Sequence, residues 1–189
     1  MIPLKSCLTI LDMQRDFLED DGFYSKRPHD ICTLVEAKHK IEKIIKKLYK
    51  KIPIVYVVAE YEYEQFGKGL AICIKGTKGQ EIVLDKKFAT QIFTKHQYSA
   101  FSSNDYTQFL IEKKIKAILL SGVLTEYCIR ATALDGINNG FKLYLIEDCI
   151  ANGRDVVDKH KATIKELLSK GAILINSNDI ADEDRLHIY

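Results

Sequence analysis

The sequence lacks any segment that would place the chain in a membrane. None of its apolar runs approaches the roughly 20 residues that a membrane-spanning helix needs, although hydrophobic residues make up 47% of the 189 positions. The N-terminal region also lacks the apolar stretch of a signal peptide, because Lys5 and then Asp12 interrupt it. We therefore expect a cytoplasmic protein with no membrane partner.

Cysteine pairs and histidine clusters are missing as well. The five cysteines include no C-x-x-C pair, and an odd number favours free thiols in a reduced compartment over a disulfide framework. The five histidines are scattered without the spacing of metal ligands, which argues against a zinc site. No G-x-S-x-G, G-x-G-x-x-G or P-loop pattern is present, so the sequence gives no sign of a serine nucleophile elbow or a bound nucleotide. We expect no cofactor.

Charge of either sign is not in excess. The 28 basic residues nearly balance the 26 acidic ones, and the formal net charge is +2. This balance implies no polyanionic partner, so we do not expect the protein to bind nucleic acid. Three prolines and the lack of any low-complexity tract leave no obvious linker, which predicts a single domain over residues 1–189.

Apolar, strand-like runs alternate with amphipathic, helix-like segments along the chain. The expected strands are residues 6–12, 54–59, 91–95, 115–121, 141–147 and 172–175, and the expected helices are residues 30–51, 105–114, 126–139 and 155–170. Such alternation predicts a mainly parallel sheet of about six strands with helices on both faces. The fold class is therefore α/β, a three-layer α/β/α sandwich with a Rossmann-like sheet.

Three polar residues follow apolar strand-like runs in this pattern. Asp12 follows the first run, Lys95 ends the third, and Cys128 opens the helix after the fourth. In a parallel sheet the carboxyl ends of the strands share one edge, and ligands bind in the crevice there. A carboxylate, an ammonium and a thiol at one edge are the groups that a cysteine nucleophile needs.

The position of Cys128 suggests an activated thiol. If Thr125 caps the helix, Cys128 lies in the first turn, where the helix dipole lowers a thiol pKa and backbone amides can receive an oxyanion. Position alone leaves the alternatives open, namely that Cys128 is a small core residue, Asp12 a loop-capping carboxylate and Lys95 a solvated lysine. Cys149, which follows a polar residue after a strand, is a second candidate nucleophile.

Several segments around these residues carry a family resemblance. They are residues 11–17 (LDMQRDF), 76–82 (GTKGQEI), 95–101 (KHQYSAF) and 122–133 (GVLTEYCIRATA), followed by the Glu-Asp pair at 147–148. With these motifs in this order, the chain resembles the isochorismatase-like cysteine hydrolase superfamily, which includes nicotinamidases and N-carbamoylsarcosine amidases. The likeness covers nearly the whole chain.

The resemblance implies roles for specific residues. Asp12, Lys95 and Cys128 would form the catalytic triad. The peptide bond between Val123 and Leu124 would be cis, and the amides of Leu124 and Cys128 would form the oxyanion hole.

The resemblance also implies a pocket and an assembly. Phe17, Tyr98 and Tyr127 fall at positions that often line the substrate pocket. Relatives are commonly dimers or tetramers whose neighbouring subunits complete the pocket, so we expect a homo-oligomer.

Two departures from the family pattern narrow the chemistry. Nicotinamidases hold a metal with an Asp-x-His pair and a further His, and the matching positions here are Tyr61, Tyr63 and Ile72, which are not ligands for such a metal. We therefore expect no metal. Isochorismatases proper usually lack the nucleophilic cysteine, which this chain keeps as Cys128.

The predicted function is hydrolysis of the C–N bond of a small amide or carbamoyl compound through a thioester. Three alternatives stay open. The first is a metal-free nicotinamidase or isochorismatase activity, and the second is a non-catalytic oligomeric binding protein. The third is a redox-active thiol protein, which the lack of a C-x-x-C pair disfavours.

Overall fold

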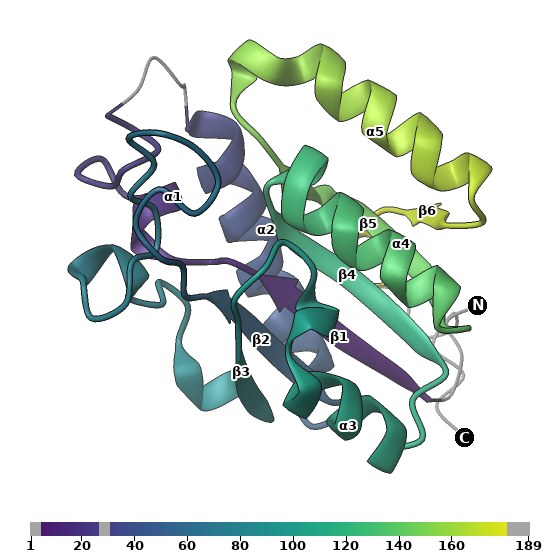
Figure 1. Cartoon of the computed structure of the whole chain (residues 1–189). Helices are drawn as coiled ribbons and strands as arrows, with labels where there is room; N and C mark the ends of the chain where they lie inside the picture. The colour runs from purple at the N-terminus through teal and green to yellow at the C-terminus, as the bar shows by residue number, and fades with distance from the viewer. Residues whose placement is uncertain (1–4, 27–30, 181–189) are drawn as a thin grey trace.

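A single parallel sheet of six strands forms the centre of the molecule. The computed structural model describes residues 5–26 and 31–180. The strand order is β3-β2-β1-β4-β5-β6, and every neighbouring pair is parallel (Figure 1). The strands are β1 (Ser6–Leu11), β2 (Ile54–Ala59), β3 (Gln91–Lys95), β4 (Ala117–Val123), β5 (Lys142–Ala151) and β6 (Ile173–Ile175). This sheet confirms the predicted α/β fold class.

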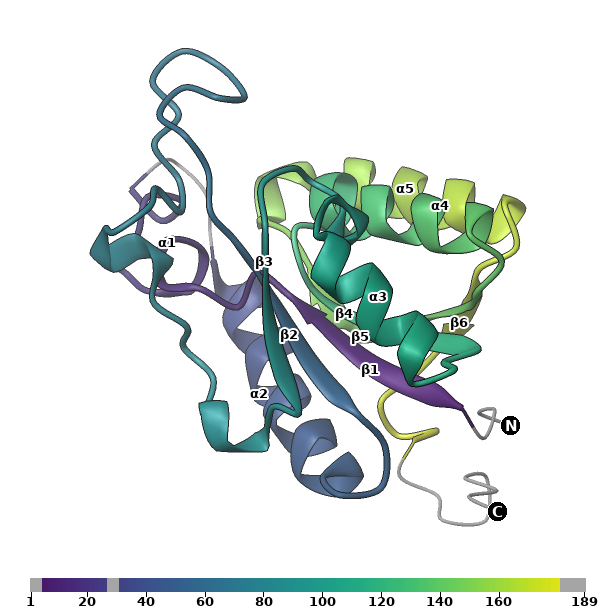
Figure 2. The same ribbon diagram turned by 60° about the horizontal axis from the view of Figure 1, so that its bottom comes forward.

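Helices cover both faces of the sheet, which gives three layers (Figure 2). One face carries α2 (Cys32–Leu48), and the other carries α3 (Asn104–Glu112), α4 (Arg130–Asn138) and α5 (Val157–Ser169). Shorter turns are α1 (Arg15–Leu18), η1 (Lys78–Gln80), η2 (Lys86–Phe88), η3 (Ala100–Ser102), η4 (Thr125–Ile129) and η5 (Arg154–Val156). None of the helices in residues 5–26 and 31–180 combines the length and the apolar composition that a membrane span requires.

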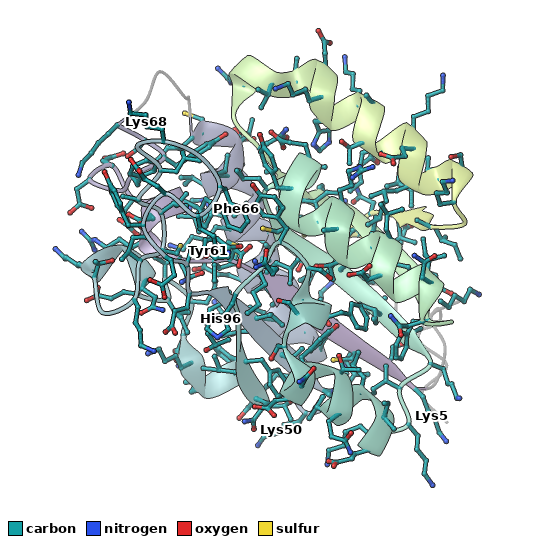
Figure 3. The ribbon with its side chains drawn as sticks, viewed as in Figure 1. Lys5, Lys50, Tyr61, Phe66, Lys68 and His96 are labelled. Atoms are coloured by element: carbon teal, nitrogen blue, oxygen red, sulfur yellow. The ribbon has the colours of Figure 1, made fainter. Side chains whose placement is uncertain are left out.

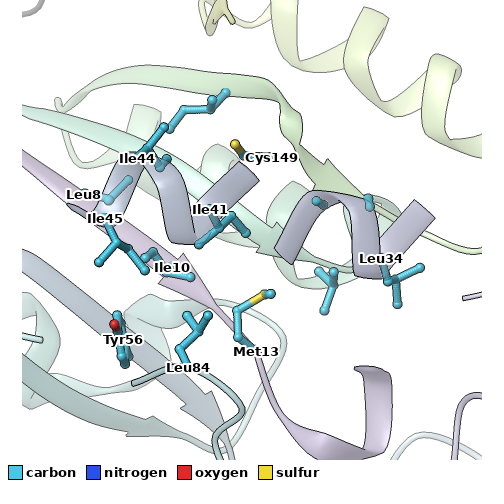
Figure 4. Packing of buried hydrophobic residues seen from close by; sticks show 14 of the residues in the cluster. Leu8, Ile10, Met13, Leu34, Ile41, Ile44, Ile45, Tyr56, Leu84 and Cys149 are labelled. Carbon is cyan, nitrogen blue, oxygen red and sulfur yellow. The ribbon is translucent and has the colours of Figure 1, made fainter. Parts of the chain in front are cut away.

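The central strands are buried on both faces, which explains their composition. Every residue of β1, β2 and β4 is buried. A strand that is covered on both faces has a continuous apolar sequence rather than an alternation of apolar and polar residues. The apolar stripe of α2 packs on this sheet through Leu34, Ile41, Ile44 and Ile45, as Figure 4 shows. Each such side chain contributes roughly 1.5–3 kcal/mol by leaving water.

The observed strands and helices differ from the expected ones mainly at their ends. Helix α2 stops at Leu48 rather than at residue 51, and its expected start at residue 30 lies outside the described residues. Strand β5 continues to Ala151, past the polar Glu147-Asp148 pair that suggests an earlier end. It can do so because the register against β4 shifts between Leu120 and Gly122.

Gly122 allows β4 to approach β1 closely, next to the strand end that carries Asp12. Its φ is +118°, and a Cβ at this position would lie 2.2 Å from the carbonyl oxygen of Leu11. A side chain there would have to displace backbone. The conformational freedom of this glycine therefore lets the ends of β1 and β4 lie side by side.

We expect Gly122→Ala to lower the free energy of unfolding by about 3 kcal/mol, because it adds backbone strain and a steric clash. Urea denaturation of the two proteins measures the loss. The matched control is Gly140→Ala, since Gly140 also has a positive φ (+81°) but a Cβ at that position would meet no atom within 4 Å. Equal losses in both variants would contradict the role of the close approach.

Candidate active site

Asp12, Lys95 and Cys128 meet at the carboxyl edge of the sheet. Asp12 follows β1, Lys95 ends β3, and Cys128 lies in the turn η4 that follows β4. Asp12 and Lys95 have no exposed surface, and Cys128 is 3% exposed. Parallel strands thus bring together three groups that are far apart in the sequence.

Lys95 connects the carboxylate to the thiol. Its Nζ lies 3.1 Å from Oδ2 of Asp12 and 3.4 Å from Sγ of Cys128. A buried ammonium is costly unless it is paired, and here the carboxylate provides the opposite charge. Apart from this ion pair, the Asp12 oxygens accept no well-aligned hydrogen bond from the described residues. The carboxylate therefore keeps lone pairs that can accept a proton.

Two further oxygen atoms surround the Lys95 ammonium. The hydroxyl of Tyr61 lies 2.5 Å from Nζ, and the carbonyl oxygen of Gln97 lies 3.1 Å from it. Tyr61 is nearly buried and also lies 3.6 Å from Sγ of Cys128. Figure 3 shows Tyr61 close to Phe66, whose ring it meets edge-on with centroids 4.9 Å apart. The sequence pointed to Tyr61 as the replacement of a metal ligand that packs against the substrate or a neighbouring subunit, and not as a contact of Lys95.

The thiol of Cys128 is protonated at rest. Burial, with the nearby charge of Asp12, raises the pKa of Cys128 to about 12, and the positive charge of Lys95 opposes this only in part. The expectation of a lowered pKa for this thiol was wrong, because burial raises it. A thiol in this state needs a base to become a nucleophile.

Asp12 and Lys95 have protonation states that suit a base and a fixed cation. Burial raises the pKa of Asp12, although the charge of Lys95 opposes it, so the carboxylate is a stronger proton acceptor than usual. Burial acts to lower the pKa of Lys95, but Asp12 and Cys128 outweigh burial and hold this pKa above its ordinary value. Lys95 therefore stays an ammonium.

The turn that carries Cys128 is a π-helical turn rather than the first turn of an α-helix. Its N-cap residue is Leu124, with no side-chain cap, so the expected capping role of Thr125 was wrong. The carbonyl of Leu124 accepts hydrogen bonds from the amides of Tyr127 and Ile129, each 3.2 Å long. The peptide bond between Val123 and Leu124 is cis.

Thr125 instead belongs to a polar cluster behind the turn. Its hydroxyl lies 3.0 Å from Nδ1 of His160, which also lies 3.0 Å from Oδ1 of Asn152. The amide nitrogen of the Asn152 side chain donates to Glu126, at 2.7 Å. These contacts tie η4 to the start of α5, and no local pattern indicates them because the residues lie far apart in the sequence.

A cavity of about 330 Å³ opens beside Cys128, which is part of its wall. Half of the lining residues are aromatic, namely Phe17, Phe23, Tyr24, Tyr61, Phe66, Tyr98 and Tyr127, and Glu126 and Lys159 supply the charges. The expected pocket residues Phe17, Tyr98 and Tyr127 therefore all lie at this cavity. A larger hollow of about 520 Å³ next to Arg15 touches none of the three triad candidates, so we assign no chemistry to it.

The aromatic wall of the cavity is internally packed. The rings of Phe66 and Tyr98 stack with centroids 4.1 Å apart and planes inclined by 19°. Tyr98 also contacts Tyr127, at 5.3 Å between centroids. Such pairs hold one another in place, which gives the cavity a flat and apolar side.

Two polar residues of the first motif organise the loops around the site, and sequence reasoning missed both. The buried Gln14 side chain bonds to both backbone groups of Ala59, with its oxygen accepting at 2.7 Å and its nitrogen donating at 2.9 Å. The Asp16 carboxylate accepts hydrogen bonds from the amides of Phe23 and Cys73, at 3.0 and 2.7 Å. Polar and apolar residues are mixed in this motif, so no local pattern singles out Gln14 or Asp16.

The other candidate nucleophile does not reach the cavity. Cys149 is buried in the core beneath α2, on the opposite face of the sheet from α4 (Figure 4). Burial raises its pKa to about 12. Cys149 therefore has no place in the site.

The parallel α/β fold thus brings a thiol, a carboxylate and an ammonium together at its carboxyl edge, which are the groups that a cysteine nucleophile would need. The model of the Isochorismatase domain family matches residues 6–179, and the chain belongs to this family of hydrolases. This confirms the resemblance of the sequence motifs.

Individual relatives are similar over most of their length. The secreted isochorismatase effector Isc1 of Verticillium dahliae is 26% identical over 182 residues, which is 93% of this chain and 90% of the relative. The structure of the pyrazinamidase of Pyrococcus horikoshii in complex with zinc has a TM-score of 0.76 and 27% identity, and the match covers 91% of this chain and 99% of that one. The N-carbamoylsarcosine amidase of Thermoplasma acidophilum has the same fold, with a TM-score of 0.74, 22% identity and 92% and 97% coverage.

The residues at the expected metal positions do not fit a metal ion. Tyr61 faces Lys95, Tyr63 is 63% exposed, and Ile72 contributes an apolar side chain to the cavity. A protonated phenol beside an ammonium and an aliphatic group provide no ligand set for a divalent cation. Within the described ranges, no group of three His, Cys, Asp or Glu residues is placed to hold one.

Proposed function

We propose that the protein hydrolyses the C–N bond of a small amide or carbamoyl compound through a thioester on Cys128. One observation carries the proposal: the Cys128 thiol lines the cavity and lies 3.4 Å from the Lys95 ammonium, which is itself paired with Asp12. A cavity of about 330 Å³ suits a small substrate.

The first half of the reaction forms the thioester. Asp12 accepts the thiol proton, and the sulfur attacks the carbonyl carbon of the substrate. The carbonyl electron pair moves to the oxygen, where the amides of Leu124 and Cys128 donate hydrogen bonds, an effect typically worth about 3–4 kcal/mol per donor. The Lys95 charge stabilises the thiolate as it forms.

The second half releases the products. The tetrahedral intermediate collapses, the C–N bond breaks, and Asp12 returns its proton to the leaving ammonia or amine. Water then attacks the thioester and gives a proton to Asp12, the C–S bond breaks, and Asp12 passes this proton to the departing Cys128 sulfur as the acid leaves. Asp12 and the thiol are thus restored, and the scheme needs no cofactor.

A second candidate function is hydrolysis of nicotinamide or a related aromatic amide without a metal. The stacked rings of Phe66 and Tyr98 favour it, because a flat apolar wall suits a planar ring. The similarity to the Pyrococcus pyrazinamidase also supports it.

Ammonia release from a panel of substrates tests both candidates. The panel holds nicotinamide, simple amides, ureides and carbamoyl amino acids, and the Cys128→Ala variant is the blank. We expect at least one compound to give ammonia that depends on Cys128 and a thioester that mass spectrometry detects. Formation of neither product across the panel would favour the non-catalytic binding protein.

We expect activity to survive removal of metals, because Tyr61, Tyr63 and Ile72 do not form a ligand set. Exhaustive dialysis against EDTA should leave kcat unchanged, and elemental analysis should find no stoichiometric zinc, iron or manganese. A zinc enzyme that EDTA readily inactivates, treated in parallel, controls for complete extraction. Loss of activity that added zinc restores would contradict the metal-free scheme.

A further inference from the structure

The hydroxyl of Tyr61 lies at the centre of the site, within reach of two members of the proposed triad. It is 2.5 Å from Nζ of Lys95 and 3.6 Å from Sγ of Cys128. Its third neighbour is the carbonyl oxygen of Gln97, at 3.3 Å. Because Tyr61 is only 3% exposed, these protein groups rather than bulk water determine where its hydroxyl hydrogen points.

The hydrogen atoms available in this cluster can be counted. An ammonium has three N–H donors and no acceptor, and Lys95 donates three hydrogen bonds, to Tyr61 at 2.5 Å, Gln97 at 3.1 Å and Cys128 at 3.4 Å. Its ion pair with Asp12, at 3.1 Å, comes in addition to these bonds. The contact with the Cys128 sulfur is the longest of these, although hydrogen bonds to sulfur are generally longer than hydrogen bonds to oxygen.

The hydroxyl of Tyr61 supplies an additional donor. Since its oxygen accepts from Lys95, its own hydrogen is left for either Gln97 or Cys128. A neutral thiol is a weak acceptor and leaves this hydrogen on the Gln97 carbonyl. A thiolate is a stronger acceptor, so the hydrogen turns to the sulfur when the thiol loses its proton.

We propose that Tyr61 is a further catalytic residue, whose hydroxyl donates a hydrogen bond to the Cys128 thiolate as it forms. The inference rests on the proposed function, in which this thiolate is the nucleophile. The thiol proton passes to Asp12, and the phenol hydrogen stays on its own oxygen throughout. Tyr61 thus stabilises the anion without taking part in the proton transfer.

Other contacts of Tyr61 suit this role. Its ring lies edge-on to Phe66, and its backbone amide donates to the carbonyl of Cys73 at 3.0 Å, so the side chain is held from two directions. Burial raises the pKa of Tyr61 far above its ordinary value, which keeps the phenol protonated. A phenol in this state is a donor and not a competing base.

The variant Tyr61→Phe tests the inference, because it removes the hydroxyl and keeps the ring. Below the thiol pKa, the rate of alkylation by iodoacetamide follows the thiolate fraction. At each pH between 7 and 9, Cys128 of the variant should therefore react about tenfold more slowly than Cys128 of the unaltered protein. Peptide mapping is needed to read Cys128 alone, since Cys32 is exposed. With a substrate from the panel, kcat should fall about tenfold or more while KM changes little.

Tyr56→Phe is the matched control. Tyr56 lies on β2, is almost fully buried, and donates its hydroxyl hydrogen to the carbonyl of Asp85 at 3.1 Å, away from the triad. This variant should lose a similar amount of stability but keep the alkylation rate of Cys128.

The outcomes separate this inference from the proposed function. An unchanged alkylation rate in Tyr61→Phe would overturn the inference even if the protein hydrolyses amides. An equal fall in Tyr56→Phe would also overturn it, because the effect would then be a general loosening of the core. If the unaltered protein hydrolysed nothing, the proposed function would fail, and the alkylation rates would still decide the role of Tyr61.

Discussion

Replacement of Cys128 by serine is expected to lower kcat by about 10⁴-fold or more, since removal of the nucleophile from such a group removes nearly all catalysis. A serine hydroxyl is close in size to the thiol but far less acidic, so Asp12 cannot generate the nucleophile. The fold should remain, because the two side chains fill nearly the same space. Ammonia release measures the rate, and circular dichroism checks the fold.

Cys149→Ala is the matched control for this prediction. Cys149 is another buried cysteine, which lies within β5 and packs beneath α2 away from the cavity. Its replacement should cost some stability and leave kcat close to that of the unaltered protein. If Cys128→Ser retained most of the activity while Cys149→Ala lost it, the assignment of the nucleophile would be wrong.

The second large effect is expected from Asp12→Asn, which should lower kcat about 10³-fold because it removes the proton acceptor and keeps the shape. Asp12 has a positive φ of 55°, a conformation that asparagine tolerates well, so the backbone should not change. The variant also leaves the buried Lys95 ammonium without its counterion, which should cost about 3–5 kcal/mol of stability.

The double variant Asp12→Asn with Lys95→Met separates these two effects. It removes the unpaired buried charge, so the free energy of unfolding should recover most of what the single variant loses. The catalytic loss should persist, because neither the base nor the cation is restored. If recovery of stability also restored the rate, the carboxylate would be a structural residue rather than the base.

The fold and the triad candidates were predictable because they depend on local features. Asp12, Lys95 and Cys128 each follow an apolar run, and parallel strands bring such positions to one edge whatever the intervening loops do. The confirmed sheet also explains why both faces of β1 and β4 are apolar in the sequence.

The details of the site were not predictable because they depend on contacts across the chain. The thiol pKa of Cys128 is set by burial, which no local pattern reveals, and the turn around it is π-helical although its sequence suggests an ordinary cap. The hydroxyl of Tyr61 reaches Lys95 only because β2 and β3 pair in one register. The oligomeric state and the residue roles stay predictions.

The strand order sets a requirement on the length of the cationic side chain. Asp12 follows β1 and Lys95 ends β3, so the two groups are separated by the whole width of β2, where Ala59 is the register partner of Lys95. Two strand spacings amount to about 10 Å between the outer backbones. The four methylene groups of lysine bridge most of this gap, and the small methyl of Ala59 leaves the path clear. A shorter cationic side chain at position 95 would not reach Asp12 across β2. A larger side chain at position 59 would lie between the two charged groups.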